Sequence, residues 1–218
     1  GSSFKESEDG WNFVTSADDW FGPIQAEVGP DGNVWILDWY NFIIQHNPTP
    51  EGYETGKGNA YINPIRDSLR GRIYSIRYKK GKEDKIVSLN KKNTDGLIRA
   101  LSSPNMFWRT TAQRLLVEQG DKKAADKLYQ LIQNTTVDEV GLNAPAIHAL
   151  WTLHGLHALE GDDQKSLRVA IGALKHPAAG VRRAAIQVLP ATEEVSKAIM
   201  EAGIFEDKDL RVVLAAVL

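Results

Sequence analysis

The sequence predicts an α+β protein that is mainly α, in which a short N-terminal β-sheet region precedes an α-solenoid of helix pairs. Before residue 93, apolar residues alternate with polar ones or form short uninterrupted runs, as in β-strands. Beyond it they recur at spacings of three and four, as on one face of a helix. The helical pattern also returns every 36 or 37 residues or so, roughly the length of a stacked helix pair. We therefore expect a β region over residues 11–92 and a helical repeat domain over residues 93–218.

The composition excludes several classes of function. The chain has 218 residues, of which 42% are hydrophobic and 25% are charged, enough for a well-packed core. A net charge of -2, with both signs interspersed, favours neither nucleic acid nor an anionic membrane as a partner. Because cysteine is absent, the chain forms no disulfide, thiolate nucleophile, iron–sulfur cluster or covalently attached c-type haem. No window approaches the roughly 20 apolar residues of a membrane-spanning helix, so we expect no such segment.

Both ends of the sequence suggest a part of a longer protein. Residues 1–10 are polar, begin with Gly1 instead of Met and carry no signal pattern, so we expect a disordered leader. Residues 209–218 form an apolar helix pattern that stops without Gly, Asn or a basic cap. We therefore expect a chain excised from a larger protein and truncated at its C-terminus.

A tight turn organises the predicted sheet. Pro30 presets φ and Gly32 supplies the positive φ that closes the turn, so residues 24–28 and 33–38 are predicted to form a β-hairpin. Residues 34–37 are all apolar, which favours an inner strand that is covered on both faces. Residues 71–78 alternate with period two and predict a further strand.

Residues 41–70 form a long, irregular connection between two of these strands. A connection of about 30 residues inside a compact sheet is more often a binding loop or a lid than a spacer. The turn lies at one end of the sheet, so the segments before residue 24 and after residue 38 meet at the opposite end. The candidate residues that we expect to converge there are Asp18, Asp19, Asp38, Tyr40 and His46. We take Asp38, Tyr40 and His46 as candidate cofactor-binding residues, and the catalytic residues stay unknown.

Several of these candidates also have a structural interpretation. Asp38 either caps the turn that follows its strand or touches a ligand, and His46 is either a hydrogen-bonded core histidine or a cofactor contact. We interpret Asp31 as a turn former that bonds its own backbone, with a calcium ligand as the alternative. His154 and His157 stand one helical turn apart, but no carboxylate or cysteine pattern accompanies them, so we expect no metal site.

The helical part contains three helix pairs and the start of a fourth. The predicted first helices of the pairs lie within residues 104–116, 145–153, 176–189 and 209–214. The predicted second helices cover residues 122–133, 164–174 and 193–202. Because one pair cannot bury its apolar side alone, neighbouring pairs must stack.

An arginine recurs at one position of the first helices. Arg109 aligns with Arg182 and Arg211, and Ala146 takes the same place in the second pair. We expect each arginine to bond carboxylates or carbonyl groups of the neighbouring repeat. Together with the turn, the expected structural residues are Gly29, Pro30, Asp31, Gly32, Arg109, Arg182 and Arg211.

Three segments carry a resemblance to a known family. Residues 29–40, which read Gly-Pro-Asp-Gly-Asn-Val-Trp-Ile-Leu-Asp-Trp-Tyr, and residues 71–76 are similar to the last blade of propellers of the glucose/sorbosone dehydrogenase type. Residues 148–156 are similar to a helix of the repeat region in large bacterial membrane-bound dehydrogenases, where HEAT-like repeats and often a c-type cytochrome domain follow such a propeller. The resemblance covers nearly the whole chain, but about one blade is present and Cys-x-x-Cys-His is absent.

The resemblance implies a propeller-blade-like β region, HEAT-like repeats and a periplasmic or otherwise exported location. It implies a quinone-dependent dehydrogenase as the parent, with pyrroloquinoline quinone and calcium as cofactors of that parent. The chain itself is expected to hold no cofactor, because most pocket residues would come from other blades. The implied partners are the remaining domains of the same protein, namely the propeller and a c-type cytochrome, or another protein.

Three function hypotheses follow. The first is a non-catalytic C-terminal scaffold or interaction part of a larger exported propeller oxidoreductase of the sugar-dehydrogenase type. The alternative is an independent protein-binding HEAT-repeat module with no enzymatic role. A third hypothesis, a small hydrolase that uses Asp19, Asp38 and His46, has the weakest support in the sequence.

Overall fold

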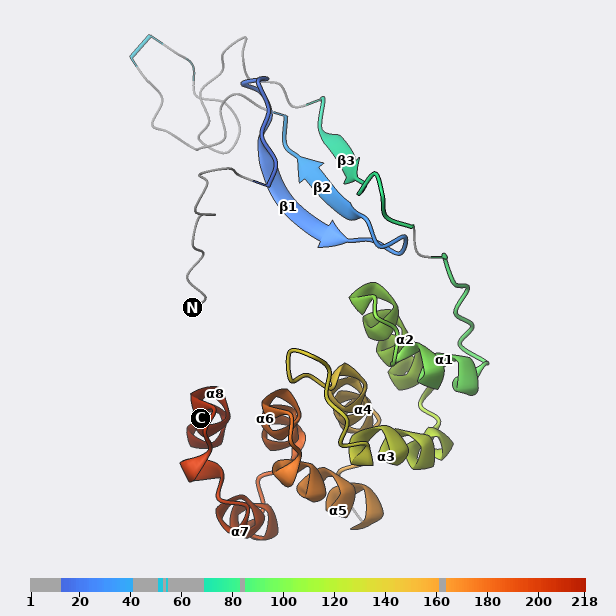
Figure 1. The fold of residues 1–218 in the computed structure, drawn as a ribbon, viewed down its shortest axis with the longest axis vertical. Helices are drawn as coiled ribbons and strands as arrows, with labels where there is room; N and C mark the ends of the chain where they lie inside the picture. Colours follow the sequence, from blue (N-terminus) through green and yellow to red (C-terminus); the bar gives the residue numbers. More distant parts are fainter. Residues whose placement is uncertain (1–12, 41–50, 53, 55–68, 83–84, 161–163) are drawn as a thin grey trace. The chain divides into compact units, whose positions relative to one another are not determined.

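The computed structural model describes residues 13–40, 51–52, 54, 69–82, 85–160 and 164–218. The chain divides into two compact units, Gly1–Asp84 and Lys85–Leu218. The first unit contains a small antiparallel sheet, and the second is helical (Figure 1). The predicted α+β class with mainly α content is therefore confirmed.

The sheet has three antiparallel strands in the order β1-β2-β3. They are β1 (Pro23–Val28), β2 (Val34–Asp38) and β3 (Arg72–Ile76). The tight turn joins β1 and β2 as the sequence predicts, and β2 is the central strand of the three. The register places Asp38 opposite Pro23 on one side and opposite Arg72 on the other.

The expectation that β2 is covered on both faces is wrong. Trp35 and Leu37, which share one face, are 39% and 42% exposed, whereas Ile36 and Asp38 on the other face are buried. An uninterrupted apolar run does not show whether both faces of a strand are covered within the same chain. One face of the sheet is therefore largely open in the part of the chain that the structure describes.

Eight α-helices are described in the second unit. They are α1 (Thr94–Ala100), α2 (Met106–Gln119), α3 (Ala125–Gln133), α4 (Ala144–Gly155), α5 (Gln164–Gly172), α6 (Ala179–Val188), α7 (Glu193–Glu201) and α8 (Leu210–Val217). Short 3-10 turns are η2 (Lys122–Ala124), η3 (Ala173–Lys175) and η4 (Ile204–Glu206). None of the described helices is both long and apolar enough to cross a lipid bilayer.

The helices form two layers in a repeat-like arrangement. The first helices α2, α4, α6 and α8 lie in one row, and α3, α5 and α7 lie in a second row (Figure 1). Successive first helices pack on one another, and α3 packs on both α4 and α5. Leucine and alanine dominate the continuous core between the layers, with Leu97, Leu116, Leu150 and Leu174 among its most buried residues. Burial of this seam stabilises helices that are each too short to persist alone in water.

Side-chain caps fix where several helices begin. Asn105 and Asn143 accept a backbone N–H in the first turns of α2 and α4, and Asp209 does so for α8. These caps satisfy backbone donors that a helix leaves unpaired at its N-terminus. They also define a common numbering for the first helices.

This numbering corrects the arginine alignment. Arg109 and Arg182 both stand four residues after the N-cap of their helices. The equivalent residue of α4 is Ile147, not Ala146, and Arg211 stands only two residues after the cap of α8. The sequence alignment slipped because an arginine stands near the start of both α6 and α8. The shared arginine position is therefore confined to α2 and α6.

Candidate functional site

Asp38 lies at the end of β2 and is the most buried of the candidate residues in the sheet, with 3% of its surface exposed. Its Oδ1 accepts hydrogen bonds from the backbone N–H groups of Gly22 and Tyr40, each at 2.8 Å. Its Oδ2 is buried and has no hydrogen-bond partner among the described residues. Asp38 therefore caps the backbone on both sides of the strand end and keeps one acceptor atom unused.

Tyr40 is held in an uncommon backbone conformation, with φ 46°. The hydrogen bond from its N–H to Asp38 fixes this conformation. Its ring lies 5.8 Å from the ring of Trp20 and 3.4 Å from the guanidinium carbon of Arg72. Tyr40 thus stands between an aromatic ring and a cation, an arrangement that stabilises both contacts.

Arg72 is the first residue of β3 and connects Tyr40 to the loop that precedes β1. Its Nη1 donates to the Tyr74 hydroxyl at 3.2 Å and lies 3.6 Å from Oδ2 of Asp18. The hydrogen bond to Tyr74 raises the pKa of Arg72 above its ordinary value, and Tyr40 adds to this effect. Asp18, Asp38, Tyr40 and Arg72 therefore belong to one end of the sheet.

The structure brings together some of the predicted candidates. Asp18, Asp38 and Tyr40 meet at this end through the contacts just described, Asp19 is exposed at the same loop, and His46 lies outside the described residues. Sequence reasoning missed Arg72. The signal that could have found it is strand pairing, because residues 71–78 paired antiparallel to residues 33–38 in the observed register place Arg72 opposite Asp38.

The cluster at this end of the sheet combines charged and aromatic side chains. It contains one buried carboxylate, one cation and aromatic rings, but no serine or histidine paired as a nucleophile and base among its described residues. Nowhere in the described residues do three His, Cys, Asp or Glu side chains gather as a possible metal site.

The turn between β1 and β2 lies at the other end of the sheet. Asp31 Oδ1 accepts from the Asn33 backbone at 3.1 Å and from the Trp35 indole at 3.0 Å, and Oδ2 accepts from the Asn33 side chain at 2.9 Å. These bonds lower the pKa of Asp31, with the indole contributing most. Gly29 accommodates the same indole, since a Cβ there would lie 2.4 Å from it. Both carboxylate oxygens of Asp31 are engaged in shaping the turn.

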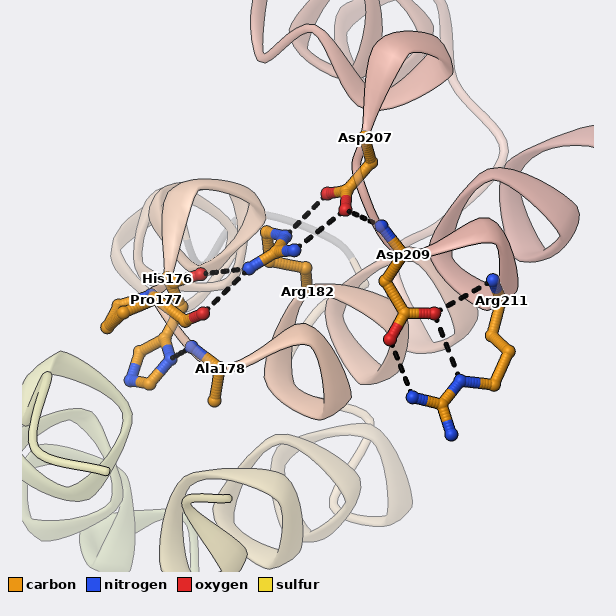
Figure 2. A network of polar contacts seen from close by, with 7 residues as sticks. All are labelled: His176, Pro177, Ala178, Arg182, Asp207, Asp209 and Arg211. Carbon is orange, nitrogen blue, oxygen red and sulfur yellow. Dashed lines mark hydrogen bonds and ion pairs between the residues drawn. The ribbon is translucent and has the colours of Figure 1, made fainter. Parts of the chain in front are cut away.

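Arg182 links two helix pairs in the second unit. Figure 2 shows its guanidinium pairing with both carboxylate oxygens of Asp207, with Nε–Oδ2 2.6 Å and Nη2–Oδ1 2.8 Å. Its Nη1 donates to the carbonyl groups of His176 and Pro177 at 2.8 and 2.9 Å. The pKa of Asp207 is lowered, chiefly by this arginine. Arg182 therefore bonds its own repeat and the next one.

Arg211 belongs to a separate contact in the same view. It bonds the carboxylate of Asp209, the residue that caps its own helix, and its side chain is largely exposed (Figure 2). Its hydrogen bonds lower the pKa of Asp209 to about 2. Arg211 thus reinforces the start of α8 and does not reach a neighbouring repeat through these contacts.

Arg109 repeats half of the Arg182 arrangement. Its Nη1 donates to the carbonyl groups of Ser103 and Pro104 at 2.7 and 2.8 Å, the same two positions that Arg182 uses. Its Nε is buried without a hydrogen-bond partner among the described residues, and burial lowers the pKa of Arg109. Arg109 and Arg182 make equivalent backbone contacts, and Arg182 also bonds the carboxylate of Asp207.

The histidines near α4 have separate environments. His148 Nδ1 contacts Gln113 Oε1 at 2.7 Å, and burial together with the charge of Arg109 lowers its pKa to about 4. The expectation that His154 and His157 stand on one helical turn is wrong, because α4 ends at Gly155 and His157 has φ 53°. The helix signal in the sequence continues past this end, whereas the backbone leaves the helix.

Comparison with known proteins relates one part of the chain to a family. A family model described as "Domain of unknown function (DUF7133)" matches residues 1–80, which include all three strands. This is a little over a third of the 218 residues. No curated protein matches the chain. The β unit therefore resembles a family that has been recognised by sequence, and its description assigns no activity.

Proposed function

We propose that the chain is a non-catalytic scaffold and interaction part of a larger exported oxidoreductase of the propeller type. In this proposal the three strands join further β-structure of the parent, and HEAT-like helix pairs support it or dock a partner. The observation that carries the proposal is the open sheet. All six residues of β1 are exposed, and apolar side chains on one face of the sheet have no cover among the described residues.

The open face has the composition of a packing surface. Leu37 lies opposite Ile73 in the register, and Trp35 precedes this pair by two residues on the same face. All three side chains are exposed. Contiguous apolar groups on a monomer mark an interaction surface or an aggregation risk, and an unpaired edge strand offers hydrogen bonds to another strand. Both features fit a sheet that packs within a larger β-assembly.

The cofactor proposal concerns the parent. Pyrroloquinoline quinone and calcium are the cofactors that the family resemblance suggests, and most of their ligands would come from other blades. Asp38 and Tyr40 are the described residues that this chain would contribute, because the buried Oδ2 of Asp38 has an unused acceptor position. The proposed partners are the other domains of the parent, a c-type cytochrome domain included.

A second candidate is an independent protein-binding helical module. The observation that favours it is α8, on which Leu210 is 79% exposed and Leu214 and Val217 are also exposed. An apolar helix face of this kind can receive a helix of another protein. In this alternative the sheet would have no further strands to join.

Amide hydrogen exchange separates the two candidates. The chain alone and the full natural gene product would be compared at β1 and at α4, whose buried core serves as the control. We expect β1 amides to be protected at least tenfold more in the full product, with α4 unchanged. Equal exchange of β1 in both would overturn the proposal.

A calorimetric titration tests the cofactor part. Pyrroloquinoline quinone with calcium would be added to the chain, to the full product and to its Asp38→Asn variant. We expect binding by the full product alone and weaker binding by the variant. Absence of binding to the full product would remove the quinone proposal and leave the helical module as the better account.

A further inference from the structure

A groove with a volume of about 450 Å³ lies in the helical unit, between the C-terminal end of α3 and the segment formed by α5 and η3. Its apolar lining includes Ile132 from α3 and Val169 and Ala173 from the opposite wall. The proposed scaffold role leaves this groove without a function.

The charge of the groove has one sign. Of the described residues that line it, Lys165, Arg168 and Lys175 are charged, and none is an aspartate or a glutamate. Lys165 pairs with Asp126 and lies 5.0 Å from the ring of Tyr129. Arg168 and Lys175 have no ion pair among the described residues. Within the described part of the chain, the groove therefore presents two cations without an ion pair beside one that is already paired.

The positions of the cations follow from helix geometry. Lys165 and Arg168 are three residues apart on α5, and seven further residues lead to Lys175. At 1.5 Å per residue, Arg168 and Lys175 are separated by roughly 10 Å along the axis, about the span of three extended residues. Gly172 lies between them, and a Cβ at this position would meet nothing within 4 Å. No side chain therefore obstructs the groove at Gly172, between Arg168 and Lys175.

We propose that this groove binds an acidic peptide segment of a protein partner. Two carboxylates of the segment would pair with Arg168 and Lys175, and an apolar side chain between them would rest on Ile132 and Val169. Both parts are needed, since isolated exposed ion pairs contribute little affinity. This inference names a partner class for the helical unit and does not depend on the role proposed for the sheet.

The observations favour a peptide over a nucleic acid. A nucleic-acid site commonly neutralises 6–10 phosphates or so. This groove offers two cations that have no ion pair among the described residues. A short segment that combines carboxylates with an apolar residue matches both the charge and the apolar floor of the groove.

Fluorescence anisotropy with the full chain tests the proposal. The probe is a fluorescein-labelled ten-residue peptide of alternating glutamate and leucine, and the same peptide with lysine for glutamate is the negative probe. We expect saturable binding of the glutamate peptide that weakens at higher salt. The Arg168→Gln/Lys175→Gln variant should weaken binding at least tenfold, whereas Lys122→Gln, at an exposed site outside the groove, should leave it unchanged.

Gly172 provides a second test that does not depend on removing cations. Gly172→Glu places a competing carboxylate in the groove and improves helix propensity, so it should abolish binding without loss of folding. Gly172→Ala is the matched control and should bind as the natural chain does. Equal binding by the double glutamine variant, or tighter binding of a single-stranded oligonucleotide than of the glutamate peptide, would overturn the proposal. The hydrogen-exchange result for the sheet is independent of either outcome.

Discussion

Arg109 and Arg182 show how one residue acquires different roles at equivalent positions. Each uses Nη1 to bond two backbone carbonyl groups before its own helix. Only Arg182 meets a carboxylate of the next repeat, in a pair whose side chains are 16% and 8% exposed. Breaking a buried pair by removing one partner leaves an uncompensated charge, which makes such pairs sensitive to mutation.

Asp207→Ala should therefore destabilise the helical unit by about 3 kcal/mol. The cause is that the largely buried guanidinium of Arg182 stays in place without its anion. The free energy of unfolding in urea measures the effect. Arg211→Gln is the control, because that side chain is 78% exposed and its loss should change the free energy of unfolding little. Equal effects of the two substitutions would contradict the prediction.

The same pair gives an acid dependence with a defined sign. The pKa of Asp207 is lowered in the folded state, so the stabilisation exists above the unfolded pKa of about 3.9 and disappears as pH falls through the lower folded value. The free energy of unfolding of Asp207→Ala should fall less than that of the natural chain in this acidic range.

His148 predicts a pH effect nearer neutrality. Its folded pKa of about 4 lies below the ordinary value of 6.5, so the unfolded chain binds its proton first as pH falls. The stability that depends on neutral His148 is fully present above pH 6.5 and declines as pH falls toward 4. After discounting for partial exposure, the loss between pH 7 and 5 should be about 1 kcal/mol. Thermal melts of His148→Gln should show a smaller loss over this interval, and an identical slope would contradict the assignment.

At the scale of helices and strands, small residues set how closely elements pack. Ala185 on α6 is completely buried, at a place that aligns with the equally buried Ala112 of α2. Ala185→Asp introduces a carboxylate without a partner and should cost several kcal/mol, about the loss expected for burying an unpaired charge. Gln187→Asp, on the exposed side of the same helix, should be nearly neutral. An unchanged melting temperature for Ala185→Asp would refute the helix register.

Gly29 plays a corresponding role in the hairpin. Gly29→Ala would displace the Trp35 indole and separate it from Asp31, with an expected cost to the β unit of about 1–2 kcal/mol. The Trp35 indole N–H resonance should shift in the nuclear magnetic resonance spectrum. The indole resonance should stay in place in Gly172→Ala, where a methyl group meets open space. A shift of the Trp35 indole resonance in Gly172→Ala but not in Gly29→Ala would rule out this account of the turn.

The elements themselves could be read from the sequence with good success. Periodicity and turn residues predicted the hairpin, the third strand and the alternating long helices, because each signal is local. The register of Arg211 and the end of α4 could not be read so well, since similar apolar patterns continue across a helix boundary. The contact of Arg72 with Tyr40 depends on strand pairing over a connection of about 30 residues, which no local pattern specifies.

At the scale of the whole molecule, the chain consists of two compact units with different amounts of core. Nearly all of the buried hydrophobic residues belong to the helical unit, and the described sheet contributes Ile36. We expect residues 85–218 alone to keep the same helical melting transition as in the full chain, as followed by circular dichroism at 222 nm or so. A lower transition or loss of helicity in the shortened chain would show that the helices require the first unit.

The stacking of Arg72 on Tyr40 has a consequence for how the long connection can vary. These two residues lie just outside the ends of residues 41–71, so their contact fastens together the exit and the return of that segment. When two ends are joined by contacts outside a loop, doubling the loop length raises the closure entropy by only about 0.6 kcal/mol. Insertions and replacements between residues 41 and 71 should therefore cost the sheet little stability as long as Arg72 and Tyr40 are kept.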